Sequence, residues 1–127
     1  MLAVVPVPRL SLRRAVGAVL VLTAGALHLY LWFDYFHRVH VVGELFLANA
    51  AAGIVIGVAL AAGDSLLAIA AGLAFALGTL AAFVMSTRFG LFGYHERFWG
   101  SWQEAAGGVE IAAALVLADA LRVELLR

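Results

Sequence analysis

Four long apolar runs fill this chain almost from end to end, and their lengths constrain its fold more than any other feature. The runs are 19, 24, 21 and 19 residues long and cover Ala15–Phe33, Val39–Ala62, Leu66–Ser86 and Trp102–Ala120. A helix needs about 20 apolar residues to cross the hydrocarbon core of a bilayer. Hydrophobic residues make up 65% of the chain and charged residues 13%, which leaves too little polar surface for a soluble protein. The sequence therefore predicts an all-α fold, a four-transmembrane-helix bundle with up-down-up-down topology.

The polar gaps between the runs are too short to hold a second domain. The longest gap, Thr87–Ser101, has 15 residues, so we expect residues 1–127 to form a single transmembrane domain with a short N-terminal segment, residues 1–14. The chain has no cysteine, which excludes disulfides and thiolate metal sites. It has no basic tract either, so the expected partner is the lipid bilayer and not nucleic acid.

The arginines predict the orientation of the helices in the cell membrane. Five of them flank the first and fourth runs on the side of the chain ends: Arg9, Arg13, Arg14, Arg122 and Arg127. Three lie on the opposite side: Arg38, Arg88 and Arg97. The positive-inside rule therefore favours a multi-pass protein with both termini in the cytoplasm.

The N-terminal part of the chain also resembles a secretory signal peptide. Arg13 and Arg14 precede an apolar stretch, and Ala24-Gly25-Ala26 resembles a cleavage site. The apolar run continues through Phe33, however, which gives it the length of a span. We therefore expect a first helix that is retained.

Small residues recur at helical spacing within the runs. Gly53 and Gly57 share one stripe of the second run, and Gly72 and Gly107 lie on similar stripes of the third and fourth. Because lipid tails are as apolar as the helices, close backbone approach at small residues drives helix packing in membranes. We expect these four glycines at helix–helix contacts, and Asn49 on another face of the second helix as an interhelical hydrogen bonder.

Ionisable side chains inside the runs are the main clue to function. Charged or titratable groups within a span are costly and usually face the bundle interior or a cavity. His28, Glu44 and Glu110 all lie in the outer half of their runs, at similar depth. We expect these three side chains to converge inside the bundle, with His40 above them and Gln103 at the rim.

A set of His and Glu side chains from several helices is the usual composition of a transition-metal site in a bundle core. His37, His40 and Glu44 follow an i, i+3, i+7 pattern on one helix face. The candidate metal ligands are therefore His28, His37, His40, Glu44 and Glu110. Four of these residues are also candidates for binding a haem or a proton-coupled small molecule such as a quinone: His28, His40, Glu44 and Glu110. The alternative is a polar network that only fixes helix register, and the Glu-x-x-His motif of di-iron bundles is absent.

Several short motifs give the chain a family resemblance. His28–Leu31, Gly43–Asn49, the Gly-Leu-Phe-Gly at Gly90–Gly93 and the acidic Glu110 are similar to elements of small four-helix membrane proteins of actinobacterial type. The overall plan also resembles that of DoxX-like four-helix proteins. The actinobacterial group has no assigned biochemical activity, so the resemblance implies a fold and adds no catalytic role.

Other functional classes remain open at this point. The small-residue stripes and an aromatic outer loop also suit a non-catalytic accessory or assembly subunit of a larger membrane complex. Four helices are too few to form a pore alone, so a transporter protomer would have to act as a homo-oligomer. An enzyme is the least supported class, because the sequence has no nucleophile–base pair and no phosphate-binding loop. Metal content would separate a metal-binding protein from an accessory subunit.

Overall fold

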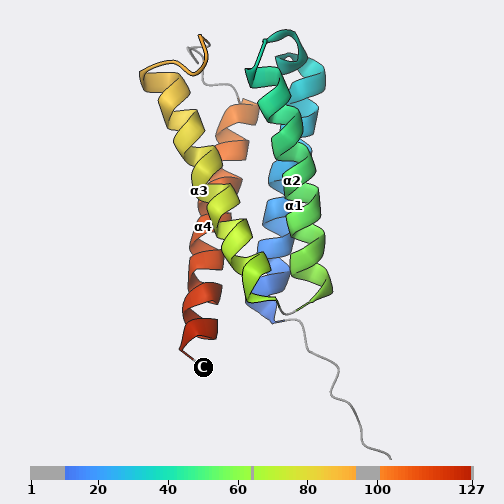
Figure 1. Cartoon of the computed structure of the whole chain (residues 1–127), viewed down its shortest axis with the longest axis vertical. Helices are drawn as coiled ribbons and strands as arrows, with labels where there is room; N and C mark the ends of the chain where they lie inside the picture. The colour runs from blue at the N-terminus through green and yellow to red at the C-terminus, as the bar shows by residue number, and fades with distance from the viewer. Residues whose placement is uncertain (1–10, 64, 94–100, 127) are drawn as a thin grey trace, which may run out of the picture.

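Four long helices make up almost all of the described chain. The computed structural model describes residues 11–63, 65–93 and 101–126. The helices are α1 (Leu12–Asp34), α2 (Val42–Ala62), α3 (Leu66–Arg88) and α4 (Ser101–Leu125), and a short 3₁₀ helix, η1 (Phe36–Arg38), lies between α1 and α2 (Figure 1). No β-strand occurs within these described ranges. The predicted all-α class is confirmed, and each predicted run corresponds to one helix.

Three of the four helices have the length and composition of membrane spans. They are α1, α2 and α3, with 23, 21 and 23 residues. The fourth helix, α4, is 25 residues long but carries more charge along its length, including Glu104, Glu110 and Asp119. The chain is therefore a helical membrane protein.

The first helix begins three residues earlier than the sequence predicts. Ser11 is its N-cap, and the Ser11 hydroxyl accepts a hydrogen bond of 3.2 Å from the backbone N–H of Arg14. A capping serine satisfies one of the free amides at a helix start and so fixes where the helix begins. Residues 1–10 of the expected N-terminal segment lie outside the described residues.

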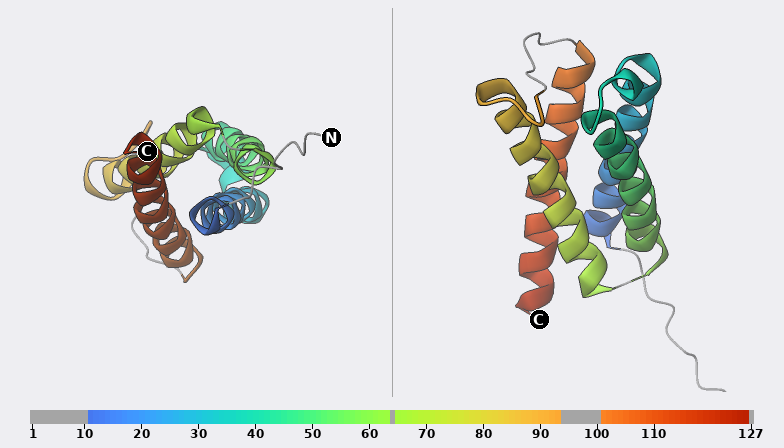
Figure 2. Two further views of the ribbon diagram at one scale, coloured as in Figure 1. Left: turned by 90° about the horizontal axis from the view of Figure 1, so that it is seen from below. Right: turned by 45° about the horizontal axis from the view of Figure 1, so that its top comes forward.

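The helices are arranged in a ring. α1 packs along α2 and along α4, α3 packs along α4, and α2 meets α3 less extensively (Figures 1 and 2). α2 ends at Ala62 and α3 begins at Leu66 at the same end of the ring, which we call the turn end (Figure 1). The opposite end, which holds η1, we call the η1 end. The α2–α3 pair is close at the turn end and spreads apart toward the η1 end (Figure 1).

Small residues pack the turn half of the ring tightly. A Cβ on Gly53 would lie 3.0 Å from the Cα of Gly25, and a Cβ on Gly72 would lie 2.8 Å from Leu117 Cδ1. A Cβ on Gly57 would collide with Leu22. The predicted helix–helix contacts of Gly53, Gly57 and Gly72 are therefore confirmed.

The same prediction is wrong for Gly107. A Cβ placed there would meet no atom of the described residues within 4 Å. The reason is that α4 does not pack closely against another helix at Gly107, which lines an internal cavity instead.

A buried arginine of α1 forms hydrogen bonds with the end of α2 and with the residue before α3. Arg14 is only 4% exposed, and its guanidinium donates hydrogen bonds of 3.1 Å to the carbonyl of Leu60 and 3.0 Å to that of Ser65. A cation is well placed there, because the free carbonyls of a helix C-terminus carry partial negative charge. Nearby, Arg13 donates to Asp119 of α4 at 2.6 Å. Arginines in the first turn of α1 and the last turn of α4 thus lie at the turn end.

The start of α2 differs from the sequence prediction. We expected a helix from Val39, but η1 and a tight turn occupy the chain up to Val41, and α2 begins at Val42. In this turn the N–H of Val42 donates to the carbonyl of His40 at 2.8 Å, and Val41 has a φ of 67°. Glu44 is therefore in the first turn of α2 and not one turn below it.

Candidate functional site

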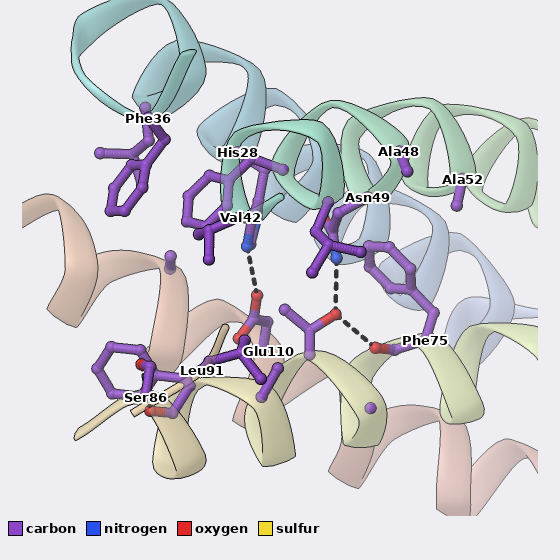
Figure 3. A pocket seen from close by; sticks show the side chains of 18 of the residues that line it. His28, Phe36, Val42, Ala48, Asn49, Ala52, Phe75, Ser86, Leu91 and Glu110 are labelled. Carbon is purple, nitrogen blue, oxygen red and sulfur yellow. Dashed lines mark hydrogen bonds and ion pairs between the residues drawn. The ribbon is translucent and has the colours of Figure 1, made fainter. Parts of the chain in front are cut away.

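A cavity of about 430 Å³ lies in the η1 half of the ring, and all four helices contribute to its wall (Figure 3). It separates two groups of buried apolar residues. The larger group fills the turn half and includes Val21, Ile69 and Leu117, whereas a small group of Leu31, Phe36 and Val42 closes the η1 end. The tight packing of one half and the spreading of α2 from α3 in the other leave this space.

The wall of the cavity is largely apolar. Four phenylalanines line it, at positions 36, 46, 75 and 83. The rings of Phe36 and Phe46 stack with their centroids 4.0 Å apart, and the ring of His28 lies 5.0 Å from that of Phe46. A planar or otherwise apolar molecule would therefore find a hydrophobic surface on several sides.

The cavity has a mouth between α2 and α3. Ala48 and Ala52 line it from α2, and Ala74 and Gly78 line it from α3. All four are small, and all are exposed or half-buried. α2 and α3, which line this opening, both have the length and composition of membrane spans.

A buried His–Glu pair forms part of the cavity wall (Figure 3). Nε2 of His28 on α1 and Oε1 of Glu110 on α4 are 3.5 Å apart, and their side chains are 8% and 3% exposed. Nδ1 of His28 lies 2.8 Å from the carbonyl oxygen of Ala24. A carbonyl can only accept, so Nδ1 carries a proton. The neutral ring then has a bare Nε2 that faces the carboxyl group of Glu110.

A second polar bridge joins the walls of the mouth. Nδ2 of Asn49 on α2 donates to Oγ1 of Thr79 on α3 at 2.7 Å, and Thr79 donates to the carbonyl of Phe75 at 2.7 Å. Thr79 has only one hydroxyl proton, and the Phe75 carbonyl can only accept. Asn49 must therefore present its N–H to Thr79, and its Oδ1 is buried with no hydrogen-bond partner among the described residues. The prediction that Asn49 bonds across helices is confirmed.

The structure brings together part of the predicted site. His28 and Glu110 meet, and Gln103 lines the same cavity as expected. The expectation that Glu44 converges with this pair and that His40 lies above it is wrong, because these two side chains pair with each other on the outside, 3.6 Å apart and 72% and 90% exposed. The physical reason is the position of Glu44 around the helix: the buried stripe of α2 includes Gly43, Ala50 and Gly53, and Glu44 lies about 100° around the helix from it, in the exposed first turn.

His37 also lies away from the cavity. It belongs to η1, is exposed, and its Nδ1 contacts the carbonyl of Trp32 at 2.8 Å. Within the described ranges no group of three or more His, Cys, Asp or Glu side chains is close enough to hold a metal ion. The pair of His28 and Glu110 offers two such ligands, so the expected five-residue metal set does not assemble. His95, in residues 94–100, lies outside the described residues.

Sequence reasoning missed two features of this site. The sequence analysis did not identify Thr79 as a partner of Asn49. A hydroxyl residue within an apolar run indicates a possible interhelical hydrogen bond and could have suggested it. The cavity itself had no signal, because alanine and glycine at its wall look the same in the sequence as alanine and glycine at a helix contact.

A comparison of this chain with known proteins matched no protein-family model, no curated protein and no solved structure. The site is therefore interpreted from its own geometry.

Proposed function

We propose that this protein binds a small, mainly apolar organic molecule, with a polar head able to exchange a proton, in the membrane-embedded cavity between its four helices. The observation that carries this proposal is the cavity of about 430 Å³ with the buried His28–Glu110 pair in its wall. Small-molecule sites typically have volumes of about 300–1,000 Å³ and combine apolar walls with a few polar groups. Of the ligands considered from the sequence, a proton-coupled small molecule fits best, since a metal would lack a sufficient set of ligands.

The mouth between α2 and α3 supports entry from the bilayer. An apolar molecule concentrates in the hydrocarbon core, and the small side chains of Ala48 and Gly78 leave a lateral path to the cavity. Such a route avoids transfer of the molecule through water.

The His28–Glu110 pair supports a role in proton exchange. The two groups lie 3.5 Å apart in a nearly dry site, and intramembrane ionisable pairs of this kind commonly belong to substrate or proton pathways. A ligand head beside the pair could exchange a proton with the bare Nε2 of His28 or with the Glu110 carboxyl group.

We further propose that α4 spans the membrane, which makes four spans in up-down-up-down order with both termini in the cytoplasm. In support, a helix of 25 residues is about 37 Å long, and α4 packs along both α1 and α3. Its most deeply buried acidic group, Glu110, points to the interior and not to lipid. Kinship with the small actinobacterial four-helix proteins is part of this proposal, and His28, Asn49 and Glu110, which carry the resemblance, all line the cavity.

Orientation can be tested in the cysteine-free chain with Gly63→Cys at the turn end and Asp34→Cys at the η1 end, both exposed positions. An impermeant thiol reagent applied to whole cells should label Asp34→Cys and leave Gly63→Cys unlabelled. The reverse pattern would place the termini outside.

Two neighbouring glycines of α4 provide a sharp test of the binding proposal. Gly107 lines the cavity and Gly108 does not, and a Cβ on either meets nothing within 4 Å among the described residues. Gly107→Leu should therefore fill the cavity, and Gly108→Leu is its matched control.

We would measure saturable binding of naphthoquinone, its hydroquinone and the dimethyl ether of that hydroquinone. The full chain would be held in lipid nanodiscs without oxygen, and binding would be followed by quenching of tryptophan fluorescence. At least one compound should bind saturably to the wild type and to Gly108→Leu, with affinity at least about tenfold lower in Gly107→Leu. Simple lipid partitioning, equal in all three proteins, would refute the proposal.

A further inference from the structure

We infer that the ligand carries one hydrocarbon chain, which leaves the cavity through the mouth between α2 and α3 while the polar head stays inside. This inference rests on the proposed function and adds the chemical class of the ligand, a ring-sized head with a single apolar chain. It follows from the size of the cavity and from the chemistry and dimensions of its mouth.

The cavity has room for a head but not for a long chain as well. If each non-hydrogen atom takes about the 30 Å³ share of a water molecule, a volume of about 430 Å³ holds about 14 such atoms. A bicyclic head such as naphthoquinone fills most of that space. A long chain attached to such a head must therefore lie outside the cavity.

The mouth gives such a chain a way out. Ala48, Ala74 and Gly78 line the cavity and are exposed, which places them at its opening. A Cβ on Gly78 would meet no atom of the described chain within 4 Å. On each helix the two small residues that line the mouth are four positions apart, so the opening extends over about 6 Å, roughly one helical turn.

The mouth is apolar even though Asn49 and Thr79 lie beside it. Asn49 donates to Thr79, and Thr79 donates to the Phe75 carbonyl. The remaining polar atom of the Asn49 side chain, Oδ1, is buried. The polar atoms at the mouth are thus bonded or covered, and a chain that passes there meets the methyl groups of alanines. Its transfer from the bilayer costs little, because lipid tails and aliphatic side chains are similarly apolar.

The Asn49–Thr79 hydrogen bond also limits the width of the mouth. It holds α2 to α3 beside the opening, so the two walls cannot separate without breaking it. Non-bonded carbon atoms rest about 3.5–4.0 Å apart, so the small side chains of the two walls leave a slot suited to one extended chain. Ala48 and Ala52 lie on the far side of Asn49 from the His–Glu pair (Figure 3). A head beside that pair would thus direct its chain past Asn49 to the mouth.

Three glycines allow the same substitution at the mouth, inside the cavity and away from it. A Cβ on Gly78, Gly107 or Gly108 meets nothing within 4 Å among the described residues, and only the first two of these glycines line the cavity. Naphthoquinone and its hydroquinone would each be compared with their decyl derivatives in nanodiscs that hold the full chain. Every affinity would be expressed as a mole fraction of the compound in the lipid, so that the greater partitioning of the decyl compounds into lipid cancels.

In the wild type, each decyl compound should bind at least as tightly as the chainless compound with the same head. Gly78→Leu should lower the affinity for the decyl compound at least about tenfold and leave that for the chainless compound within about threefold, because the new side chain fills the mouth. Gly107→Leu should lower both affinities, and Gly108→Leu should lower neither. Circular dichroism and the melting temperature would show that each variant is folded.

A second pair of variants tests the mouth from the opposite wall. Ala52 lines the cavity, whereas its neighbour Ala51 is exposed and does not. Ala52→Leu should therefore repeat the effect of Gly78→Leu, and Ala51→Leu is its matched control. This pair decides the inference should Gly78→Leu fail to fold.

The outcomes separate the inference from the proposed function. Saturable binding of the chainless compounds with at least about tenfold weaker binding of their decyl derivatives to the wild type would overturn the chain and leave the binding function standing. Equal effects of Gly78→Leu on the two kinds of compound, or no effect on either, would overturn the exit between α2 and α3. Absence of saturable binding by any compound would overturn both.

Discussion

His28 and Glu110 face each other across the α1–α4 interface, with 3.5 Å between Nε2 and Oε1, in a part of the protein where both side chains are nearly inaccessible. A second His–Glu pair, His40 and Glu44, has almost the same separation, 3.6 Å, but lies exposed at the start of α2. The two pairs have the same chemistry and different surroundings. The exposed pair is therefore an internal control for the effect of burial on the interaction energy of a His–Glu pair.

The buried pair should be energetically coupled and the exposed pair should not. Replacement of either His28 or Glu110 by alanine leaves the partner buried without its counterpart, which costs about 1–3 kcal/mol of unfolding free energy. A double-mutant cycle, measured by SDS titration in mixed micelles, should give a coupling energy of about 0.5–3 kcal/mol for this pair. The same cycle on His40 and Glu44 should give no measurable coupling, because water solvates both groups. Additive effects at His28 and Glu110 would contradict the contact.

Two adjacent arginines at the start of α1 should differ in the same way. Arg14 is buried and bonds to the carbonyls of Leu60 and Ser65, so Arg14→Leu leaves both carbonyls without these hydrogen bonds. We expect a loss of about 3–6 kcal/mol of unfolding free energy, since each of the two hydrogen bonds from this charged group is worth about 1.5–3 kcal/mol. Arg13→Leu removes only an ion pair in which both side chains are more than 40% exposed, and should leave stability unchanged. Equal losses in the two variants would show that the arginines act through charge alone.

The fold was largely predictable because the length and apolar content of a span leave few alternatives. Each of the four runs became a helix, and the three glycines that mark close contacts, Gly53, Gly57 and Gly72, were found from their spacing. Gly107 has the same kind of spacing and lies at a cavity. A stripe of small residues in the sequence predicts where a second helix can pack closely. Whether a second helix does pack there depends on how all four helices are arranged.

The site was only half predictable, and the error has a local cause. His28 and Glu110 were identified from depth, which holds because α1 and α4 are regular through these positions. Glu44 was misplaced because α2 begins later than expected and because its buried stripe, which includes Gly43 and Ala50, does not include Glu44. The turn at Val41 has a backbone conformation that a β-branched residue rarely adopts, so no sequence rule would have placed it there.

That turn leads to a prediction of its own. Val41 has φ 67° and ψ −56° and is the centre of a turn in which Val42 bonds to the His40 carbonyl. Such a conformation is strained for valine and accessible to glycine. Val41→Gly should therefore stabilise the protein by about 1 kcal/mol, because relief of the backbone strain outweighs removal of a half-buried isopropyl group. Val39→Gly is the control: Val39 is extended at φ −96° and packs on the group at the η1 end, so this variant should be less stable than wild type. Destabilisation by both substitutions would mean that Val41 is not strained.

The contrast between packed and hollow halves can be measured with one substitution at two helical glycines. Gly57→Leu and Gly78→Leu make the same chemical change and gain the same helix propensity, about 0.8 kcal/mol over glycine. They differ in what a side chain meets. At Gly57 it collides with Leu22 and approaches the Ala18 carbonyl at 3.4 Å, whereas at Gly78 no atom of the described chain lies within 4 Å.

We therefore expect Gly57→Leu to force α1 and α2 apart and to lower the unfolding free energy by about 1–3 kcal/mol, the usual cost of overpacking. Gly78→Leu should be neutral or stabilising by up to about 1 kcal/mol, because the new side chain enters existing space and replaces glycine within a helix. SDS titration of both variants in mixed micelles would measure the difference. If Gly78→Leu proved as damaging as Gly57→Leu, α2 and α3 would have to be in close contact at the level of the cavity, and the space that we assign to a ligand would not exist.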